Sequence, residues 1–531
     1  MALKVLTALD SARTQLYHFK AIIIAGMGLF SDAYDLFCIP PIMTLIGRIY
    51  YSDEPKSVDK IYQVPAEVTS IMIAVALLGT AIGQVVFGHL GDQVGRRKVY
   101  GLSLMLMFLS SIACGFSICT SRTCVMLSLG FFRFVLGLGI GGDYPLSATI
   151  MSEFSNKKTR GAFIAAVFSM QGFGILMSSM VTMVVCAVFD RASSKPPPGK
   201  RAPEVADLAW RIILMIGAVP AGLTYYWRMK MPETARYTAL VENNVVQAAL
   251  DMERILDVPI SEMTEEGLLP PHPQESYTLF SKEFFRRHGR DLFACSIAWF
   301  LVDVVFYSSN LFQSKIYDDY LPHQKNVNVY QEALKVARFQ AIMAICSTIP
   351  GYFATVYFID RIGRVKIQML GFFFMALSLF AIGVPYSYWS KNKNGGFLVL
   401  YGLTFFFSNF GPNTTTFIVP AELFPARFRT TCHGIAGAAG KAGAIIGSIG
   451  FLWASHNKEE DGYSKGIGMT ASLVILGGVS TLGLVTTYLF SRETMGRSLE
   501  DNENEDDITG VCFLRGFKCC DNNGIIMADD Y

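Results

Sequence analysis

The stretch Gly88-His-Leu-Gly-Asp92-Gln-Val-Gly-Arg-Arg-Lys98 returns later in the chain as Asp360-Arg-Ile-Gly-Arg-Val-Lys366. The aspartate, the glycine three residues after it, the first arginine and the lysine all recur at one offset, that from Asp92 to Asp360. A second pattern, Glu153 to Arg160, recurs as Glu422 to Arg429 at an offset only one residue longer. Because two unrelated patterns share nearly one offset, the sequence predicts two halves related by duplication.

The composition places much of this chain in a lipid bilayer. Of 531 residues, 52% are hydrophobic and 17% are charged, whereas an ordinary globular protein has about 25% charged residues. Such an excess of apolar residues cannot be buried in soluble cores alone. The same composition excludes disorder, coiled coil and collagen, and a net charge of +2 gives no basic field for nucleic acid. Cysteines inside apolar runs are interpreted as small buried residues: Cys38, Cys114, Cys186, Cys295 and Cys346.

The apolar runs are long enough to cross a bilayer as helices, which needs about 20 residues each, and they are too long for barrel strands. We therefore predict an all-α polytopic membrane protein with about twelve transmembrane helices in two six-helix halves, residues 1–230 and 292–499. A cytoplasmic central loop covers residues 231–291, and an acidic cytoplasmic tail covers residues 500–531. The predicted spans are 19–46, 67–91, 98–120, 124–148, 161–189, 208–230, 292–317, 332–360, 367–389, 396–421, 432–455 and 466–491.

Basic residues gather in the loops after the second, fourth, eighth and tenth predicted spans. The positive-inside rule makes these loops cytoplasmic. The loop 190–207 is an exception, because it carries four basic residues and yet lies outside by parity. The majority of the loops places both termini and the central loop in the cytoplasm.

We single out six ionisable residues inside predicted spans, since such a residue costs roughly 2.5–3.5 kcal/mol at mid-bilayer on insertion scales. They are Asp32, Asp35, Arg133, Asp143, Asp303 and Lys441. Structural pairing is one explanation, and for Arg133 with a carboxylate it is as plausible as a functional role. Pairing cannot account for all six, because two acids would remain. Unpaired intramembrane acids favour coupling to protons or cations.

A donor-rich face lies in the seventh span, where Trp299, Asp303 and Tyr307 follow one another at intervals of four residues and so share one helix face. Other polar groups inside spans are Tyr144, Gln171, Asn413 and Lys441. Hydrogen-bond donors together with an intramembrane lysine suit an oxyanion, whereas a sugar site favours several Gln and Asn residues without a lysine. Each aromatic residue alone could be core filler, but the face as a whole favours a binding site.

The repeated motif Gly88–Lys98 resembles the loop signature of the major facilitator superfamily. More specific stretches resemble the plant high-affinity inorganic phosphate:proton symporters of the plasma membrane, and the similarity runs from about Leu6 to Glu500. These stretches are Ser31–Phe37, Gly141–Glu153, Gly161–Val167 and Asn409–Thr416.

This resemblance implies a role for each candidate residue. The implied phosphate site is Tyr144, Gln171, Trp299, Asp303, Tyr307 and Asn413, with Lys441 nearby. The implied proton-coupling residues are Asp32, Asp35, Asp143 and Asp303, with Arg133 beside them. Gating is expected of the repeated motifs, through Asp92, Arg96, Arg97, Asp360, Arg364, Glu153, Arg160, Glu422 and Arg429.

The function we expect is import of inorganic phosphate with protons by alternating access, with arsenate carried as well. Alternatives are a symporter for a sugar, another anion or an organic cation, and a phosphate receptor that has kept the fold. We expect no enzyme activity, cofactor, metal or nucleic-acid partner. The partners expected are phosphate, protons and the bilayer, and the central loop and tail are where regulatory phosphorylation or trafficking factors could act.

Overall fold

The structure is a computed structural model, and it describes only part of the chain. The described residues are 16–51, 64–117, 121–193, 205–244, 246–248, 250, 277–320, 328–392, 395–456, 465–499, 519–521 and 524–526. Residues 251–276 of the predicted central loop and most of the acidic tail therefore lie outside the described residues. In the tail, β1 (Cys519–Asp521) pairs antiparallel with β2 (Gly524–Ile526).

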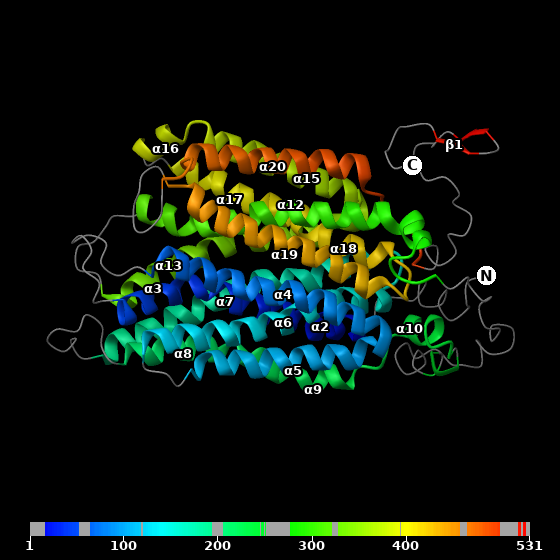
Figure 1. The fold of residues 1–531 in the computed structure, drawn as a ribbon, viewed down its shortest axis with the longest axis horizontal. Helices are drawn as coiled ribbons and strands as arrows, with labels where there is room; N and C mark the ends of the chain where they lie inside the picture. The colour runs from blue at the N-terminus through cyan, green and yellow to red at the C-terminus, as the bar shows by residue number, and fades with distance from the viewer. Residues whose placement is uncertain are drawn as a thin grey trace.

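The bundle is built from long helices that run side by side, with the early and late helices on opposite sides (Figure 1). The first half contains α2 (Leu16–Phe37), α3 (Ile39–Tyr50), α4 (Ala66–Val94), α5 (Arg96–Gly115), α6 (Arg122–Phe154), α7 (Arg160–Ala192), α8 (Ala206–Ile216) and α9 (Ala218–Lys230). The short α10 (Ala235–Leu240) follows. The second half contains α12 (Lys282–Tyr320), α13 (Val329–Met343), the π-helix η2 (Ala344–Thr348), α14 (Ile349–Ile362), α15 (Arg364–Gly383), α16 (Tyr386–Asn392), α17 (Gly395–Asn409), α18 (Pro412–Leu423), α19 (Arg429–Ala454) and α20 (Met469–Phe490).

Eleven helical segments among the described residues are long and apolar enough to cross a membrane. The predicted span 396–421 is not continuous, because it consists of α17 and α18 separated by Phe410 and Gly411. Pro412 begins α18, and a proline is favoured at a helix start because it has no N–H to donate. A Cβ on Gly411 would lie 2.5 Å from the Cα of Gly371, so α15 packs directly against this break. The all-helical, multi-pass prediction is confirmed.

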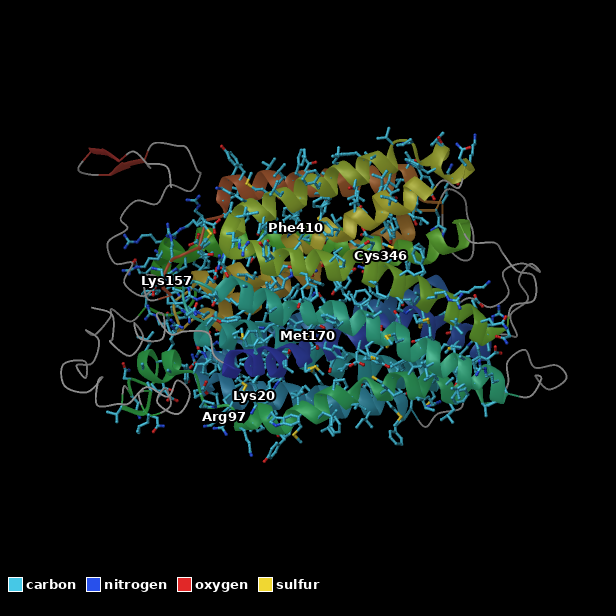
Figure 2. The ribbon with its side chains drawn as sticks, turned by 180° about the vertical axis from the view of Figure 1, so that it is seen from behind. Lys20, Arg97, Lys157, Met170, Cys346 and Phe410 are labelled. Atoms are coloured by element: carbon cyan, nitrogen blue, oxygen red, sulfur yellow. The ribbon has the colours of Figure 1, made fainter. Side chains whose placement is uncertain are left out.

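Two further expectations change. The helix α12 begins at Lys282, within the predicted central loop. The cysteines Cys38, Cys114, Cys186 and Cys295 are buried as expected, but Cys346 is exposed, because its position in η2 faces out of the bundle. Figure 2 places Cys346 away from both ends of the bundle. Cys124, at the start of α6, is disulfide-bonded.

Close packing of α4 against α19 joins the two halves. A Cβ on Gly88 would lie 2.7 Å from the Thr430 carbonyl oxygen, and Gly434 faces the Gln84 backbone with no room for a side chain. Small residues of this kind let membrane helices approach to backbone contact. The helix interface between the halves is therefore continuous through the middle of the bundle, where the candidate site lies.

Candidate functional site

Lys441 forms the centre of a buried polar cluster between the halves. Its Nζ donates to Asp303 Oδ2 at 3.0 Å and to Tyr307 Oη at 3.1 Å. Asp303 is 1% exposed and Lys441 is 3% exposed, so this ion pair has almost no water to screen it. Asp303 and Tyr307 project from one face of α12, as their spacing predicts, while Lys441 reaches them from α19.

A chain of hydrogen bonds beside this cluster joins the two halves. Gln171 Nε2 of α7 lies 3.5 Å from Tyr144 Oη of α6. Tyr352 Oη of α14 donates to Gln171 Oε1 at 2.6 Å, and Asn413 Nδ2 of α18 donates to Tyr352 Oη at 3.0 Å. Asn413 Nδ2 also donates to Asn409 Oδ1 at 2.8 Å. Groups from both halves therefore meet in one network.

Aromatic rings enclose this network. The Tyr144 ring lies 6.5 Å from the Trp299 ring and 6.1 Å from that of Phe417. Phe417 stacks on Phe168 at 4.5 Å. The Lys441 ammonium lies 5.3 Å from the centre of the Tyr144 ring, within cation–π range. Aromatic walls exclude water and so strengthen the charges inside.

All seven predicted binding residues are thus found in one place, and the structure adds Tyr352. Tyr352 was missed because a tyrosine in an apolar span is ordinary core filler. Its neighbour Gly351 offers the only hint, since a Cβ there would lie 2.5 Å from the Phe406 carbonyl oxygen. Such close approach of α17 leaves Tyr352 pointing toward Gln171 and Asn413.

The acids of the first half form a second buried group. Asp143 accepts from Arg228 Nη1 at 2.8 Å, and the Arg228 guanidinium lies 3.6 Å from the centre of the Tyr100 ring. Asp32 is 0% exposed, and neither of its carboxylate oxygens has a hydrogen-bond partner among the described residues. Asp35 accepts from Ser111 Oγ at 3.3 Å.

Arg133 is close to these acids but does not form the carboxylate pair considered above. Its hydrogen bonds in the structure go to main-chain carbonyls, from Nε to Met72 at 3.4 Å and from Nη1 to Asp35 at 3.5 Å. The cation that neutralises Asp143 is instead Arg228, which sequence reasoning left out because it lies at the end of its predicted span. The first half therefore carries one more buried cation than predicted.

Two aspartates lock the halves together at one end of the bundle, which we call the motif end because it holds both copies of the repeated motif. Asp92 of α4 accepts from the backbone N–H groups of Thr430 (3.2 Å) and Thr431 (2.8 Å) at the start of α19. Asp360 of α14 accepts from the N–H groups of Gly161 (3.2 Å) and Ala162 (2.8 Å) at the start of α7. Each carboxylate thus accepts hydrogen bonds from free backbone N–H groups in the first turn of a helix of the opposite half. The helix dipole favours negative charge at this end.

Buried glutamates reinforce each lock. Glu153 Oε1 accepts from Arg429 Nη1 at 2.7 Å, across the halves, and lies 3.3 Å from Arg96 Nη2 within its own half. Glu422 accepts from Arg364 Nε at 2.9 Å and from its Nη2 at 2.8 Å.

The remaining two predicted gating residues bind near these locks. Arg160 Nη1 donates to the Arg497 carbonyl at 3.0 Å. Arg97 is exposed and stays within the first half, where its Nη2 donates to the Met229 carbonyl at 2.6 Å. Among the predicted gating residues, Arg97 alone has a side chain whose hydrogen bond neither joins the two halves nor contacts a lock residue.

A third repeated pair was missed. Thr234 Oγ1 donates to Glu153 Oε2, and Thr494 Oγ1 donates to Glu422 Oε2, both at 2.5 Å. The preceding glutamates cap an earlier helix of the same half: Glu233 accepts from Arg97 N of α5 at 3.1 Å, and Glu493 accepts from Arg364 N of α15 at 3.0 Å. Burial raises the pKa of the Glu233 carboxyl, although the backbone N–H groups of Thr234 and Arg97 lower it. The dipeptide Glu-Thr occurs at both places in the sequence and could have predicted this repeated pair.

The opposite end of the bundle is also held across the halves. Arg48 of α3 pairs with Glu332 of α13 at 2.7 Å, and Ser193 Oγ lies 3.0 Å from Tyr330 Oη. Contacts at both ends leave the central cluster enclosed. Within the described residues, no group of three or more His, Cys, Asp or Glu side chains could hold a metal ion. The arrangement suits a buried anion that is reached from either end in turn.

Comparison with known proteins gives this arrangement a family. Residues 21–505 match the family described as Sugar (and other) transporter. The chain is 64% identical to "Probable inorganic phosphate transporter 1-9" of Arabidopsis thaliana, over 95% of this chain and 96% of that protein. It is 61% identical to "Probable inorganic phosphate transporter 1-10" of Oryza sativa subsp. japonica, over 96% and 93%. The chain belongs to the plant inorganic phosphate transporter 1 family.

Members of this family are transporters and not enzymes. A further relative, 54% identical over 96% of this chain and 97% of its own length, is "Low affinity inorganic phosphate transporter 3" of Petunia hybrida, so membership does not settle the affinity class. A solved major facilitator superfamily proton:xylose symporter shares the fold, with a TM-score of 0.71 and 18% identity over 92% of this chain and 98% of the other. The predicted fold is confirmed by this likeness.

Proposed function

We propose that this multi-pass membrane protein imports inorganic phosphate together with protons across the plasma membrane by alternating access. The observation that carries the proposal is the buried Lys441–Asp303 pair surrounded by donors from both halves. Phosphate is proposed as the substrate because the relatives are named inorganic phosphate transporters. Tyr144, Gln171, Trp299, Asp303, Tyr307, Asn413 and Lys441 would bind phosphate, with Tyr352 added to them.

Coupling follows from the charge of this pair. A phosphate that enters the cluster meets the Lys441 ammonium, which attracts it, and the Asp303 carboxylate, which repels it at low dielectric. Protonation of Asp303 removes the repulsion, frees the ammonium from its partner and creates a further donor. Proton and phosphate then bind cooperatively, and release of the proton on the side of higher pH expels the phosphate.

Asp32, Asp35 and Asp143 would carry protons through the first half, with Arg133 beside them. Asp32 is the strongest candidate, because it is fully buried and its oxygens accept no hydrogen bond among the described residues. An isolated buried carboxylate is costly when ionised and so favours the protonated form. Arg228 would oppose protonation of Asp143 in this closed state, because the two side chains pair at 2.8 Å.

The motif end would face the cytoplasm. Lys20, Arg97 and Lys157 lie at this one end of the bundle, in accord with the positive-inside rule (Figure 2). The disulfide of Cys124 supports the same orientation, because α6 begins at the opposite end and disulfides persist outside the cytosol. Both termini, the central loop and the acidic tail would then be cytoplasmic, where regulatory phosphorylation or trafficking factors could reach them.

Uptake of radiolabelled phosphate in a phosphate-transport-deficient yeast tests the proposal. Uptake should rise as the external pH falls and should collapse when a protonophore is added. Arsenate should compete, because it presents the same oxygens to the same donors, whereas sulfate and sugars should not. Uptake that is insensitive to the protonophore, or competition by a sugar, would overturn the proposal, and phosphate-dependent signalling without flux would favour a receptor.

Tyr307→Phe should weaken the apparent affinity for phosphate without abolishing transport. The change removes the hydroxyl that now accepts from Lys441 at 3.1 Å and would bind phosphate. A lost hydrogen bond of this kind costs about 1–2 kcal/mol, so the apparent KM should rise roughly 5- to 30-fold. Uptake measured against phosphate concentration gives this value.

Tyr401→Phe is the matched control, because Tyr401 Oη is also buried in the second half but donates to the Ser309 carbonyl at 2.6 Å, outside the cluster. Its apparent KM should stay near that of the unchanged protein. Equal KM values for the two variants would mean that Tyr307 serves only packing.

A further inference from the structure

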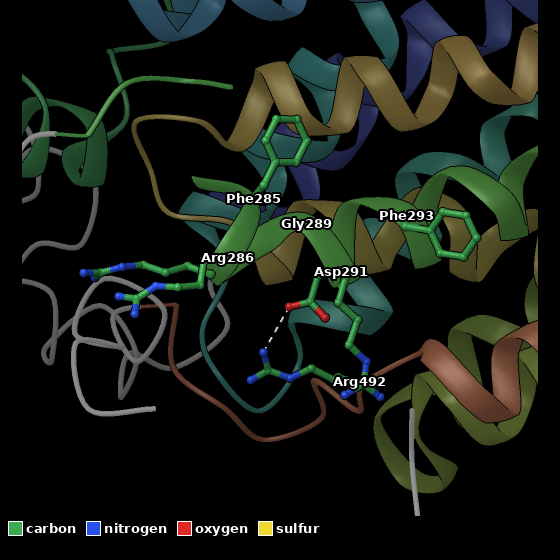
Figure 3. A pocket seen from close by; sticks show the side chains of 8 residues that line it. Phe285, Arg286, Gly289, Asp291, Phe293 and Arg492 are labelled. Atoms are coloured by element: carbon green, nitrogen blue, oxygen red, sulfur yellow. Dashed lines mark hydrogen bonds and ion pairs between the residues drawn. The ribbon is translucent and has the colours of Figure 1, made fainter. Parts of the chain in front are cut away.

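A pocket opens on the second half at the motif end, beside the first turns of α12. Its volume is about 310 Å³. Figure 3 shows Arg286 and Phe293 extending from α12 in opposite directions, with the Asp291–Arg492 pair between them. The lining residues are Phe285, Arg286, Arg287, Gly289, Arg290, Asp291, Phe293 and Arg492. None of these residues belongs to the central cluster or to the predicted gating motifs.

The lining carries excess positive charge. Four of its side chains are arginines and only one is acidic. Asp291 pairs with Arg492 at 3.0 Å, and the nearby Glu283 accepts from Arg286 at 2.7 Å and from Arg287 at 2.5 Å. Even with Glu283 included, the arginines outnumber the carboxylates by two. Guanidinium groups bind phosphate oxygens in a forked geometry, so the pocket suits a phosphate-bearing anion.

The pocket lies where α12 passes from a charged segment to an apolar one. Residues 282–291 include six that carry charge at neutral pH, whereas residues 292–302 include none. Phe285 is 52% exposed and Phe293 is 44% exposed, one before and one after the arginines along the helix. Helical segments that lie in the membrane–water interface carry Lys or Arg on one face and Trp, Phe or Leu on another.

We propose that this pocket binds the phosphate-bearing head group of an anionic phospholipid. The arginines bind the head-group phosphate, while the acyl chains cover Phe285 and Phe293. A free phosphate ion would satisfy the arginines but would leave both rings uncovered, which is why the structure favours a lipid. Basic pockets between transmembrane helices at the cytoplasmic surface bind anionic head groups in this way.

The bound lipid would also affect the lock at the motif end. Arg290 Nη2 donates to the Leu489 carbonyl at 3.3 Å, so the pocket connects α12 to the end of α20. Arg492 directly precedes Glu493 and Thr494, which cap α15 and bind Glu422 in the motif-end lock. A head group held by Arg290 and Arg492 therefore acts on the contacts that position Arg364, which pairs with the lock residue Asp360 at 2.8 Å. The lipid thus acts on the rate of transport without touching the substrate.

The test uses the full-length protein purified in detergent, with phosphatidic acid as the anionic lipid and phosphatidylcholine as the neutral one. Native mass spectrometry should show phosphatidic acid retained in preference to phosphatidylcholine. Arg286→Gln/Arg290→Gln should weaken this retention about fivefold or more, since each basic residue near a membrane contributes about 1 kcal/mol. The single variant Arg286→Gln, whose side chain is 71% exposed and so can change without unfolding the protein, should show an intermediate loss.

Lys366→Gln is the matched control, because Lys366 is an exposed basic residue of the same half at the same end and lies outside the pocket. It should retain phosphatidic acid as the unchanged protein does. Equal retention by all three variants would overturn the proposal. Competition by inorganic phosphate as strong as that by phosphatidic acid would also overturn it, because the pocket would then be an ion site. In vesicles, transport by the unchanged protein should respond to phosphatidic acid, and the double variant should not.

Discussion

Asp303→Asn is expected to abolish proton-driven phosphate uptake while leaving phosphate binding in place. Asparagine does not ionise, so the repulsion between residue 303 and phosphate is absent at every pH. The Lys441 ammonium, now paired at 3.0 Å, becomes permanently available to the anion, and release loses its trigger. Binding to the purified protein should therefore become nearly independent of pH, and uptake in the transport-deficient yeast should fall to background.

Stability must be separated from coupling in this experiment. Removing one partner of a buried ion pair costs about 3–5 kcal/mol, so the amount of folded protein at the membrane has to be measured for each variant. Asp303→Asn/Lys441→Met removes both charges and should recover stability, but it should bind phosphate poorly. Asp207→Asn is a control, because Asp207 pairs with Arg211 at 2.9 Å outside the cluster. Robust, pH-dependent uptake by Asp303→Asn would assign the coupling proton to another group.

The main features of the site follow from the sequence because they depend on periodicity and duplication. Residues 299, 303 and 307 had to share a face once their segment was helical. The charge of Lys441 inside an apolar span required a partner, and Asp303 provides it. The duplicated Asp92 and Asp360 marked equivalent helix ends, and both bind the start of a helix from the opposite half.

The remaining contacts depend on how helices pack, which spacing alone does not determine. Tyr352 follows the π-helix η2, where an extra residue per turn changes which side chains face inward. Arg228 reaches Asp143 because α9 packs beside α2 and α5. The local sequence around Arg228 does not predict that Asp143 is its partner. The break between α17 and α18 was visible as Gly411-Pro412, but its role, which is to present Asn413 to Tyr352, required the fold.

The locks at the two ends of the bundle differ in strength, and this difference bears on the resting state. At the motif end, Glu153 and Arg429 are buried and joined at 2.7 Å. At the opposite end, the side chains of Arg48 and Glu332 are 18% and 43% exposed. Exposed ion pairs contribute about 0.2–1 kcal/mol, whereas a hydrogen bond to a buried charged group contributes about 1.5–3 kcal/mol. Opening toward the motif end should therefore be the costlier step.

Glu153→Gln is expected to slow turnover much more than it changes phosphate binding. Its bond to Arg96 lies within one half and survives opening, so only the bond to Arg429 distinguishes closed from open. Losing about 1.5–3 kcal/mol from the closed form shifts the closed-to-open ratio roughly 10- to 150-fold. The motif end must close again in every import cycle, and without this bond closing becomes the slow step. Uptake kinetics should then show a lower Vmax with a nearly constant KM, and spin labels on α6 and α19 should report a wider motif end. Glu332→Gln weakens the opposite end and should shift the same balance slightly the other way. A KM that rises for Glu153→Gln while Vmax is kept would place Glu153 in binding rather than gating.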